Sequence, residues 1–373
     1  PPAPSLLAEG RAMLTAITAD FQAVPGVNVR SLGEPGASAT GGCLSPVADA
    51  PGSPAFFTLV RSSDYTLVIA PECGGRLEYL CRLVLDADGK LLGPSPDAVR
   101  LTADKLALAR HWERHGVTTP ATWPLGEEPP GLAVVVKPRD GAGSQAMALI
   151  KQRTGVGFPS PPASGGEGLG VRGLRRAERR EPPDDNKIGP LTGHPLAQDP
   201  PYLGPIPPNR GEREVNWTSV GPFPGPMIVQ QYIRGFAASV AFLIGPDSLT
   251  PLVPCEQRLS DDGRFQYLGG RLPIPPDLAG RAVRVATGAV RCVPGLRGYV
   301  GVDVVLGSDG RDWAIEINPR LTTSYVGLRA LARINLAGAM LAAVRGETMP
   351  ELQWHSGTVE FTPDGSVRWA WGR

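Results

Sequence analysis

Cysteine and histidine are scarce in this sequence. Its 373 residues include five cysteines and four histidines, and no two of the scattered cysteines form a CxxC pair. A disulfide framework and a zinc site are therefore excluded, and reduced thiols in a cytoplasmic setting are expected. The histidines show no arrangement with a serine or cysteine that is typical of nucleophilic catalysis.

Excess charge and long apolar runs are also lacking. The 37 basic and 36 acidic residues leave a formal net charge of +1, which gives no electrostatic reason to expect nucleic acid or an anionic membrane as partner. No apolar run approaches the roughly 20 residues that span a bilayer. The chain begins Pro1-Pro2-Ala3-Pro4, without Met or a signal-like core, so we expect a processed or trimmed N-terminus.

Apolar periodicity divides the chain into predicted helices and strands. Helices are expected over 6–21, 77–85, 102–115, 278–293 and 324–345. Strands are expected over 27–32, 64–70, 132–136, 227–233, 237–244, 249–257, 298–306 and 313–318, with a polar hairpin at the end. The last two of these strands flank Gly307-Ser-Asp-Gly310, a strong hairpin turn. The order of strand 64–70, glycine turn and helix 77–85 predicts a parallel α/β lobe near the N-terminus.

Residues 152–221 break these patterns. They contain Pro-Ser-Pro-Pro, Ser-Gly-Gly-Glu-Gly and a basic run from Arg172 to Arg180. Such a composition cannot bury enough apolar surface to offset its ordering entropy, so a disordered insertion between two strands is expected. The basic run is interpreted as solvated charge rather than as a nucleic-acid contact.

A lysine and a glycine-rich loop follow the predicted strand 132–136. The loop reads Lys137-Pro-Arg-Asp-Gly-Ala-Gly-Ser144. Backbone N–H groups around Gly141, Gly143 and Ser144 can approach phosphate oxygens because glycine has no Cβ, and Lys137 adds a cation. The alternative is an ordinary exposed bend. A P-loop is not supported, because the Lys-Ser/Thr ending is missing.

Two carboxylates and an amide lie on the predicted hairpin. Glu316 and Asn318 are two residues apart and share one face of their strand, and the hairpin brings Asp303 alongside them. The interleaved positions are apolar: Val302, Val304, Ile315 and Ile317. Hard oxygen ligands on one sheet face suit a Mg²⁺ ion that carries nucleotide phosphates. The alternative is a solvated face with surface charges.

Further polar residues surround this hairpin in the sequence. Arg320 follows Pro319, and its planar guanidinium group can reach a phosphate or a substrate carboxylate. The hydroxyls of Thr322, Thr323 and Ser324 precede a predicted helix and could meet an anionic group, whereas helix capping explains only one of the three. Glu72 follows strand 64–70, at the kind of edge where ligands collect in parallel sheets. Capping of the next helix explains it equally well.

Five segments, in this order and spacing, resemble the ATP-grasp superfamily. They are Asp104-Lys105, Lys137-Pro-x-x-Gly-x-Gly-Ser144, Gln230-Gln-Tyr-Ile-x-Gly235, Gly301-Val-Asp303 and Glu316-Ile-Asn-Pro-Arg320. The resemblance covers 77–344 outside the insertion and implies an α+β ATP-grasp fold. It implies a pre-ATP-grasp parallel α/β lobe over 1–100, a lid and ATP-binding subdomain over 101–235 that contains the insertion, and a C-terminal subdomain over 236–373 with the metal site.

The resemblance also implies a role for each matching residue. Lys105 and Lys137 would hold the nucleotide phosphates together with the glycine loop. Gln230, Gln231 and Ile233 would form the hinge that binds adenine, although Gln230 stands where glutamate is commoner in the family. Asp303, Glu316 and Asn318 would bind Mg²⁺ or Mn²⁺.

Shorter segments are similar to the tyramine–L-glutamate ligase group of this superfamily, which serves methanofuran biosynthesis. They are Ile69-Ala-Pro-Glu72, Leu91-Leu-Gly-Pro-Ser95, Tyr267-x-Gly-Gly270 and 318–327. This likeness implies a Mg-ATP-dependent, ADP-forming ligase, monomeric or dimeric, that joins L-glutamate to tyramine or a similar amine through an acyl phosphate. Lys137 and Arg320 would assist catalysis. The alternatives are carboxylation, a small-molecule kinase, or a non-catalytic ATP-binding regulator.

Overall fold

The computed structural model describes residues 4–32, 51–129, 131–141, 147–151 and 225–370. All of these belong to one compact unit, which takes in residues 1–155 and 211–373. The expected insertion at 152–221 lies outside the described residues, as do Gly143 and Ser144. No helix within the described ranges is long and apolar enough to cross a membrane.

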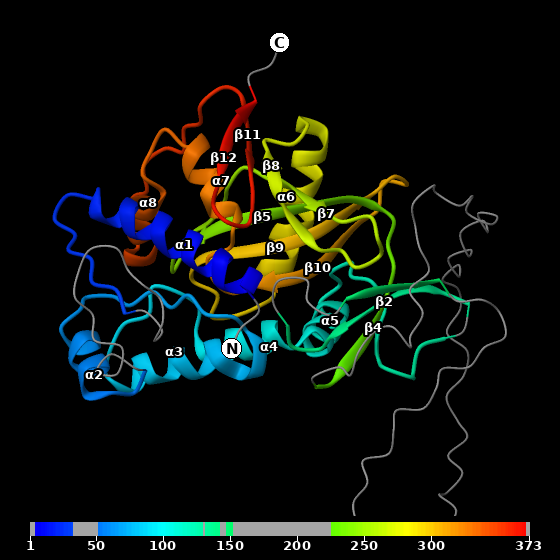
Figure 1. The fold of residues 1–373 in the computed structure, drawn as a ribbon, viewed down its shortest axis with the longest axis horizontal. Helices are drawn as coiled ribbons and strands as arrows, with labels where there is room; N and C mark the ends of the chain where they lie inside the picture. Colours follow the sequence, from blue (N-terminus) through cyan, green and yellow to red (C-terminus); the bar gives the residue numbers. More distant parts are fainter. Residues whose placement is uncertain (1–3, 33–50, 130, 142–146, 152–224, 371–373) are drawn as a thin grey trace, which may run out of the picture. The chain divides into compact units, whose positions relative to one another are not determined.

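A large antiparallel sheet forms the C-terminal half (Figure 1). Its strand order is β10-β9-β5-β7-β8-β11-β12, with β6 paired to β5. The strands are β5 (Gly235–Ile244), β6 (Leu249–Pro251), β7 (Cys255–Leu259), β8 (Tyr267–Leu272), β9 (Gly298–Gly307), β10 (Asp312–Asn318), β11 (Thr358–Phe361) and β12 (Val367–Ala370). The predicted hairpins of 298–318 and of the C-terminal segment are therefore confirmed.

Helices cover both faces of this sheet because its side chains alternate along each strand. Helix α6 (Pro276–Arg291) packs on one face, where Val302 and Val304 are almost fully buried. The other face carries α1 (Pro4–Gln22), α7 (Ser324–Leu331) and α8 (Leu336–Arg345) over a second core cluster that contains Leu243 and Tyr299. Asp303 lies on this second face, because it alternates with Val302 and Val304 along β9.

A smaller sheet has the strand order β1-β4-β2-β3. Its strands are β1 (Thr122–Pro124), β2 (Ala133–Pro138), β3 (Ala148–Lys151) and β4 (Met227–Gln231). Val134, Val136, Met227 and Val229 form an apolar cluster on one face. Directly paired residues share a face, so the pairs Val135–Gln230 and Lys137–Ile228 lie on the opposite one. Lys137 and Gln230, both predicted to contact nucleotide, are therefore on the same side of this sheet.

The N-terminal lobe is mainly helical, which differs from the predicted parallel α/β arrangement. It contains α2 (Pro54–Arg61), a short 3₁₀ turn η1 (Cys73–Gly75), α3 (Arg76–Asp86) and α4 (Pro96–Ala103), and α5 (Lys105–Arg114) follows it. The strands expected over 27–32 and 64–70 do not form. Within the described residues the lobe holds one isolated parallel bridge, Thr66 to Leu91, and a lone bridge cannot propagate without further neighbouring strands.

One predicted helix begins later than expected, and another is broken in two. The helix expected over 102–115 begins at Lys105, as α5. The extended backbone of Asp104 ends α4, and the Asp104 carboxylate caps α5 by accepting a hydrogen bond from the Ala107 N–H. The helix expected over 324–345 is interrupted after Leu331. There Ala332 pairs with Trp354, and the Asn335 side chain caps α8 at the Gly338 N–H. Local capping thus overrides a continuous apolar period in both places.

Candidate functional site

A β-bulge in β10 brings the predicted metal ligands to one sheet face. Pairing along the hairpin is regular from Asp312 to Ala314, and then slips by one residue so that Glu316, not Ile315, lies opposite Asp303. Asn318 then lies opposite Gly301. Without the slip, Glu316 would point into the core beneath α6, because side chains alternate along a strand. Ile315, predicted to share the buried face, is half-buried and lies outside both large core clusters.

Two side-chain amides hold the carboxylate of Asp303. Gln257 Nε2 donates to Asp303 Oδ1 at 2.9 Å, and Asn318 Nδ2 donates to Asp303 Oδ2 at 3.2 Å. Burial, together with the nearby charge of Glu316, raises the pKa of Asp303 to about 7 despite these hydrogen bonds. A bound cation would reverse this effect, because it stabilises the ionised carboxylate.

Two lysines from different elements face Glu316. Lys105 Nζ lies 3.7 Å and Lys137 Nζ 4.0 Å from Glu316 Oε2. Lys137 is 2% exposed, and burial lowers its pKa to about 8 although Glu316 opposes the shift. Burial acts to raise the pKa of Glu316, but the two lysines outweigh it, so that pKa lies below its usual value. Such closely held cations can neutralise a polyphosphate, and phosphate binding by both lysines remains a prediction.

The base of the glycine loop is tied to the start of α5. Lys105 Nζ donates to the Gly141 carbonyl at 2.7 Å, and the Lys105 N–H donates to the Arg139 carbonyl. Arg139 in turn forms a bidentate ion pair with Asp104, in which Nε donates to Oδ1 at 2.8 Å and Nη2 donates to Oδ2 at 2.6 Å. Gly141 therefore lies beside the predicted phosphate-binding lysine, and the next five residues of the loop lie outside the described ones.

Arg320 is held by Glu72 across 248 residues of sequence. Its Nε and Nη2 atoms face the two oxygens of Glu72 at 2.9 and 3.1 Å, and its Nη1 donates to the Leu321 carbonyl. Glu72 is 4% exposed, so this is a buried ion pair. The partner of Glu72 is thus an arginine rather than a helix end, and a role for Glu72 in substrate binding remains a prediction.

Glu9 of α1 is a neighbour of Arg320 that sequence reasoning missed. Its Oε2 accepts from Thr323 Oγ1 at 3.3 Å. Burial raises the pKa of Glu9, and the charge of Arg320 only partly offsets the shift. An acidic residue on a helix more than 300 positions earlier leaves no signal in the sequence near Arg320.

The three predicted hydroxyls have partners within the protein. Thr322 and Ser324 bond to each other at 2.7 Å, and each bonds to the Tyr299 hydroxyl, at 3.0 and 3.1 Å. Thr323 donates to Glu9. These bonds fix the turn that follows Arg320, and a direct role of the three in substrate binding remains a prediction.

The predicted adenine hinge lies at the end of β4. Gln230 is 5% exposed and donates through Nε2 to Thr122 Oγ1 at 3.0 Å. The backbone N–H of Gln231 donates to the Ala121 carbonyl, and that of Tyr232 to the Ala133 carbonyl. Because these donors are used within the protein, contacts from Gln230, Gln231 and Ile233 to adenine remain a prediction.

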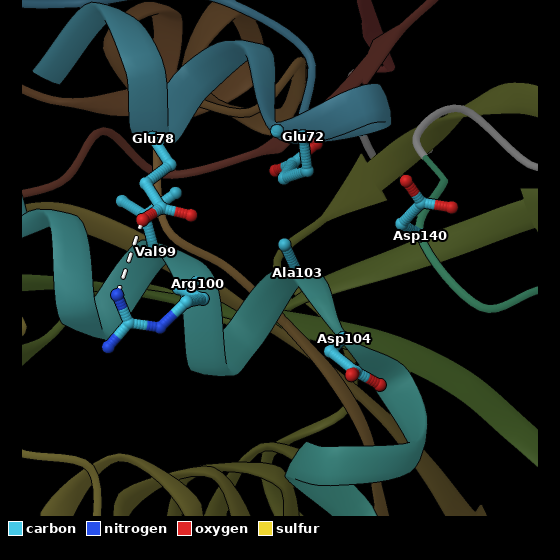
Figure 2. A pocket seen from close by; sticks show the side chains of 8 residues that line it. Glu72, Glu78, Val99, Arg100, Ala103, Asp104 and Asp140 are labelled. Atoms are coloured by element: carbon cyan, nitrogen blue, oxygen red, sulfur yellow. Dashed lines mark hydrogen bonds and ion pairs between the residues drawn. The ribbon is translucent and has the colours of Figure 1, made fainter.

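An acidic pocket of about 150 Å³ adjoins the site at Glu72 (Figure 2). Its lining includes Glu72, Glu78, Asp104 and Asp140, with Arg100 directed at Glu78. Each carboxylate already has a partner. Glu72 pairs with Arg320, Glu78 with Arg100, Asp104 with Arg139, and Asp140 accepts from the Gly74 N–H at 3.0 Å. The pocket is therefore a junction where η1, α4 and the glycine loop meet.

The ligand set fits a Mg²⁺ ion that also binds phosphates. Among the described residues, no three His, Cys, Asp or Glu side chains gather into a metal-binding group. The set here is two carboxylates and one amide. Mg²⁺ in nucleotide sites is held through one or two carboxylates and completes its shell with phosphate oxygens and waters, so this set and the adjacent lysines suit such an ion.

Comparison with known proteins identifies the domains. A pre ATP-grasp 3 domain matches residues 46–99 and an ATP-grasp domain matches residues 210–324. The tyramine–L-glutamate ligases of Methanocaldococcus jannaschii and Methanocaldococcus fervens are 38% and 35% identical over 102 residues, which is 27% of this chain. The matched stretch spans about a third of each relative, 32% and 33%.

A solved structure supports the fold over nearly the whole chain. The carboxyaminoimidazole ribonucleotide synthase from Aspergillus clavatus, complexed with ATP, has a TM-score of 0.60 at 14% identity. The match covers 95% of this chain and 78% of that one. The chain therefore has the ATP-grasp fold, with a match to a pre ATP-grasp domain ahead of a match to an ATP-grasp domain.

Proposed function

We propose that this protein is a Mg-ATP-dependent carboxylate–amine ligase that forms ADP and an amide. The observation that carries the proposal is the grouping of Asp303, Glu316 and Asn318 on one sheet face, with Lys105 and Lys137 within 4.0 Å of Glu316. A metal-binding face and buried cations together suit a triphosphate, whose transfer relies on positioning and charge neutralisation.

The chain's own residues have distinct tasks in this reaction. A bound Mg²⁺ would offset negative charge on the phosphates. Lys105 and Lys137 orient the phosphate groups, and Arg320, fixed by Glu72, directs its remaining N–H groups to anionic oxygen. A substrate carboxylate oxygen attacks the γ-phosphorus while the bond to the ADP oxygen breaks. The amine then attacks the acyl carbon, loses a proton, and phosphate leaves.

The substrate class is proposed from the relatives. Both curated relatives bear the name tyramine–L-glutamate ligase, so we propose L-glutamate and tyramine or a similar amine as substrates. A cytoplasmic location, a role in methanofuran biosynthesis and a monomeric or dimeric state belong to the same proposal, as do the domain boundaries at 100 and 235. Carboxylation and small-molecule phosphorylation are the alternative reactions of this fold, and a non-catalytic ATP-binding regulator is the alternative outside catalysis.

The test is an ADP-release assay with purified protein, Mg²⁺ and ATP. We expect ADP and phosphate only when L-glutamate and an amine from a panel that includes tyramine are both present. Release that depends on bicarbonate would favour carboxylation, and a phosphorylated small molecule would favour a kinase. Tight ATP binding without turnover on any member of the panel would favour the regulator.

Glu72→Gln should weaken both stability and activity. The change removes the charge that offsets the buried Arg320 guanidinium, and breaking such a pair costs about 3–5 kcal/mol. Urea unfolding measures this loss directly, and ADP release should fall because Arg320 is no longer fixed. Glu78→Gln is the matched control, since its arginine partners are half exposed and such pairs contribute about 1 kcal/mol or less. Equal stability of the two variants would refute the buried role of Glu72.

Deleting Ile315 should preserve the site. The deletion removes the extra residue of the bulge, so regular pairing from Ala314 onward still sets Glu316 opposite Asp303. Inserting one alanine after Ile315 should instead move Glu316 and Asn318 to the face beneath α6. Mg²⁺-dependent ADP release is expected to persist in the deletion variant and to vanish in the insertion variant. Loss in both variants would show that the bulge itself, rather than the face it selects, is required.

A further inference from the structure

Gln257 reaches Asp303 from two strands away. It lies on β7, and β5 separates that strand from β9, which carries Asp303. Ser239 of β5 pairs with Asp303 on one side and with Cys255 on the other. Ala237 shares the face of Ser239, because residues two apart on a strand point the same way. These small side chains leave room for Gln257 Nε2 to span β5 and donate to Asp303 Oδ1 at 2.9 Å.

The two amides at Asp303 differ in what else they can do. Asn318 donates to Asp303 Oδ2 at 3.2 Å, and it lies beside Glu316 as part of the predicted ligand set. Asn318 can bind a cation only through its amide oxygen. Gln257 is on the far side of Asp303 from that strand and engages only Oδ1. It can therefore hold one carboxylate oxygen while the other stays available on the Asn318 side.

We propose that Gln257 is a positioning residue of the metal site, which fixes the Asp303 carboxylate so that Oδ2 is presented toward Glu316 and Asn318. The inference rests on the proposed Mg²⁺ site. Partners that hydrogen-bond to a metal ligand set its orientation, and their loss typically lowers metal affinity about 10- to 100-fold. A donor that merely satisfied a buried carboxylate would affect stability instead.

The test is a Mn²⁺ titration of the full chain, followed by electron paramagnetic resonance, which reports free Mn²⁺ without any turnover. Gln257→Met keeps the size of the side chain and removes the donor, and Gln257→Ser provides a second variant that is too short to reach Asp303. Arg258→Met is the matched control, because Arg258 is the exposed neighbour on the same strand, with its side chain 52% exposed. Thermal unfolding and the Kd of metal-free ADP are measured alongside.

Both Gln257 variants should raise the Kd for Mn²⁺ about 10- to 100-fold, with the ADP Kd unchanged and the control like wild type. Equal Mn²⁺ affinity in wild type and the Gln257 variants would overturn the role of Gln257 and leave the metal site standing. A wild-type protein that binds no Mn²⁺, with or without ADP, would overturn the proposed metal site and this inference together.

Discussion

Glu316→Gln is expected to reduce ADP release about 1,000-fold or more. The change removes the residue that links the two halves of the site, because Glu316 lies opposite Asp303 and within 4.0 Å of both Lys105 and Lys137. Loss of one preorganised charge-stabilising group in an active site commonly costs about 10²–10³-fold, and this residue would also hold the metal. Initial rates of ADP formation at saturating Mg²⁺ and ATP measure the effect.

The same substitution should also lower stability. Lys105 and Lys137 are nearly buried, and the carboxylate that offsets their charge disappears, at a cost of about 3–5 kcal/mol. Asp312→Asn is the matched control. It makes the equivalent change on the same strand and breaks a partly buried pair with Arg281, at 2.6 Å, at the opposite end of β10. The control should lose stability and keep activity, and comparable activity in the two variants would refute the role of Glu316.

Lys137→Met is expected to have the second largest effect. Strand β2 carries this lysine on the sheet face that also holds Gln230. Its side chain is 3% exposed, and its Nζ lies 4.0 Å from Glu316 Oε2. Methionine keeps most of the apolar stem and removes only the cation, so the core of the small sheet should persist. We expect ATP affinity to fall and ADP release to drop about 100-fold or more, since the proposed role of this cation is to neutralise charge that builds up during transfer.

Lys90→Met serves as the control for Lys137→Met, because Lys90 is exposed on the N-terminal lobe and should leave both quantities unchanged. Calorimetric titration with a non-hydrolysable ATP analogue separates binding from turnover. Wild-type affinity and wild-type turnover in Lys137→Met would remove this lysine from the nucleotide site.

The composition of the site could be predicted from short sequence patterns, because each pattern acts within one strand or one hairpin. Lys137 follows a buried strand, and Glu316 and Asn318 are two residues apart, which fixes a shared face. The pairing with Asp303 was predicted correctly, but its cause was not. The turn alone would set Ile315 opposite Asp303, and only the bulge corrects the register.

Long-range partners could not be predicted because no local pattern records them. Gln257 crosses a whole strand to reach Asp303, and Glu9 reaches Thr323 across 314 residues. The strand expected over 64–70 failed for a related reason. Its apolar run satisfies the pattern of a buried strand, yet within the described residues its only ladder contact is the bridge from Thr66 to Leu91, so tertiary context decides against a sheet.

Oxygen transfer from substrate to phosphate tests the central claim most directly. L-Glutamate labelled with ¹⁸O in its carboxylates is incubated with the protein, Mg²⁺, ATP and tyramine, and the released phosphate is analysed by mass spectrometry. A carboxylate that attacks the γ-phosphorus and is later displaced by the amine leaves one of its oxygens on phosphorus. The account predicts one ¹⁸O atom in each phosphate released, and phosphate that carries only oxygen from ATP and water would contradict it.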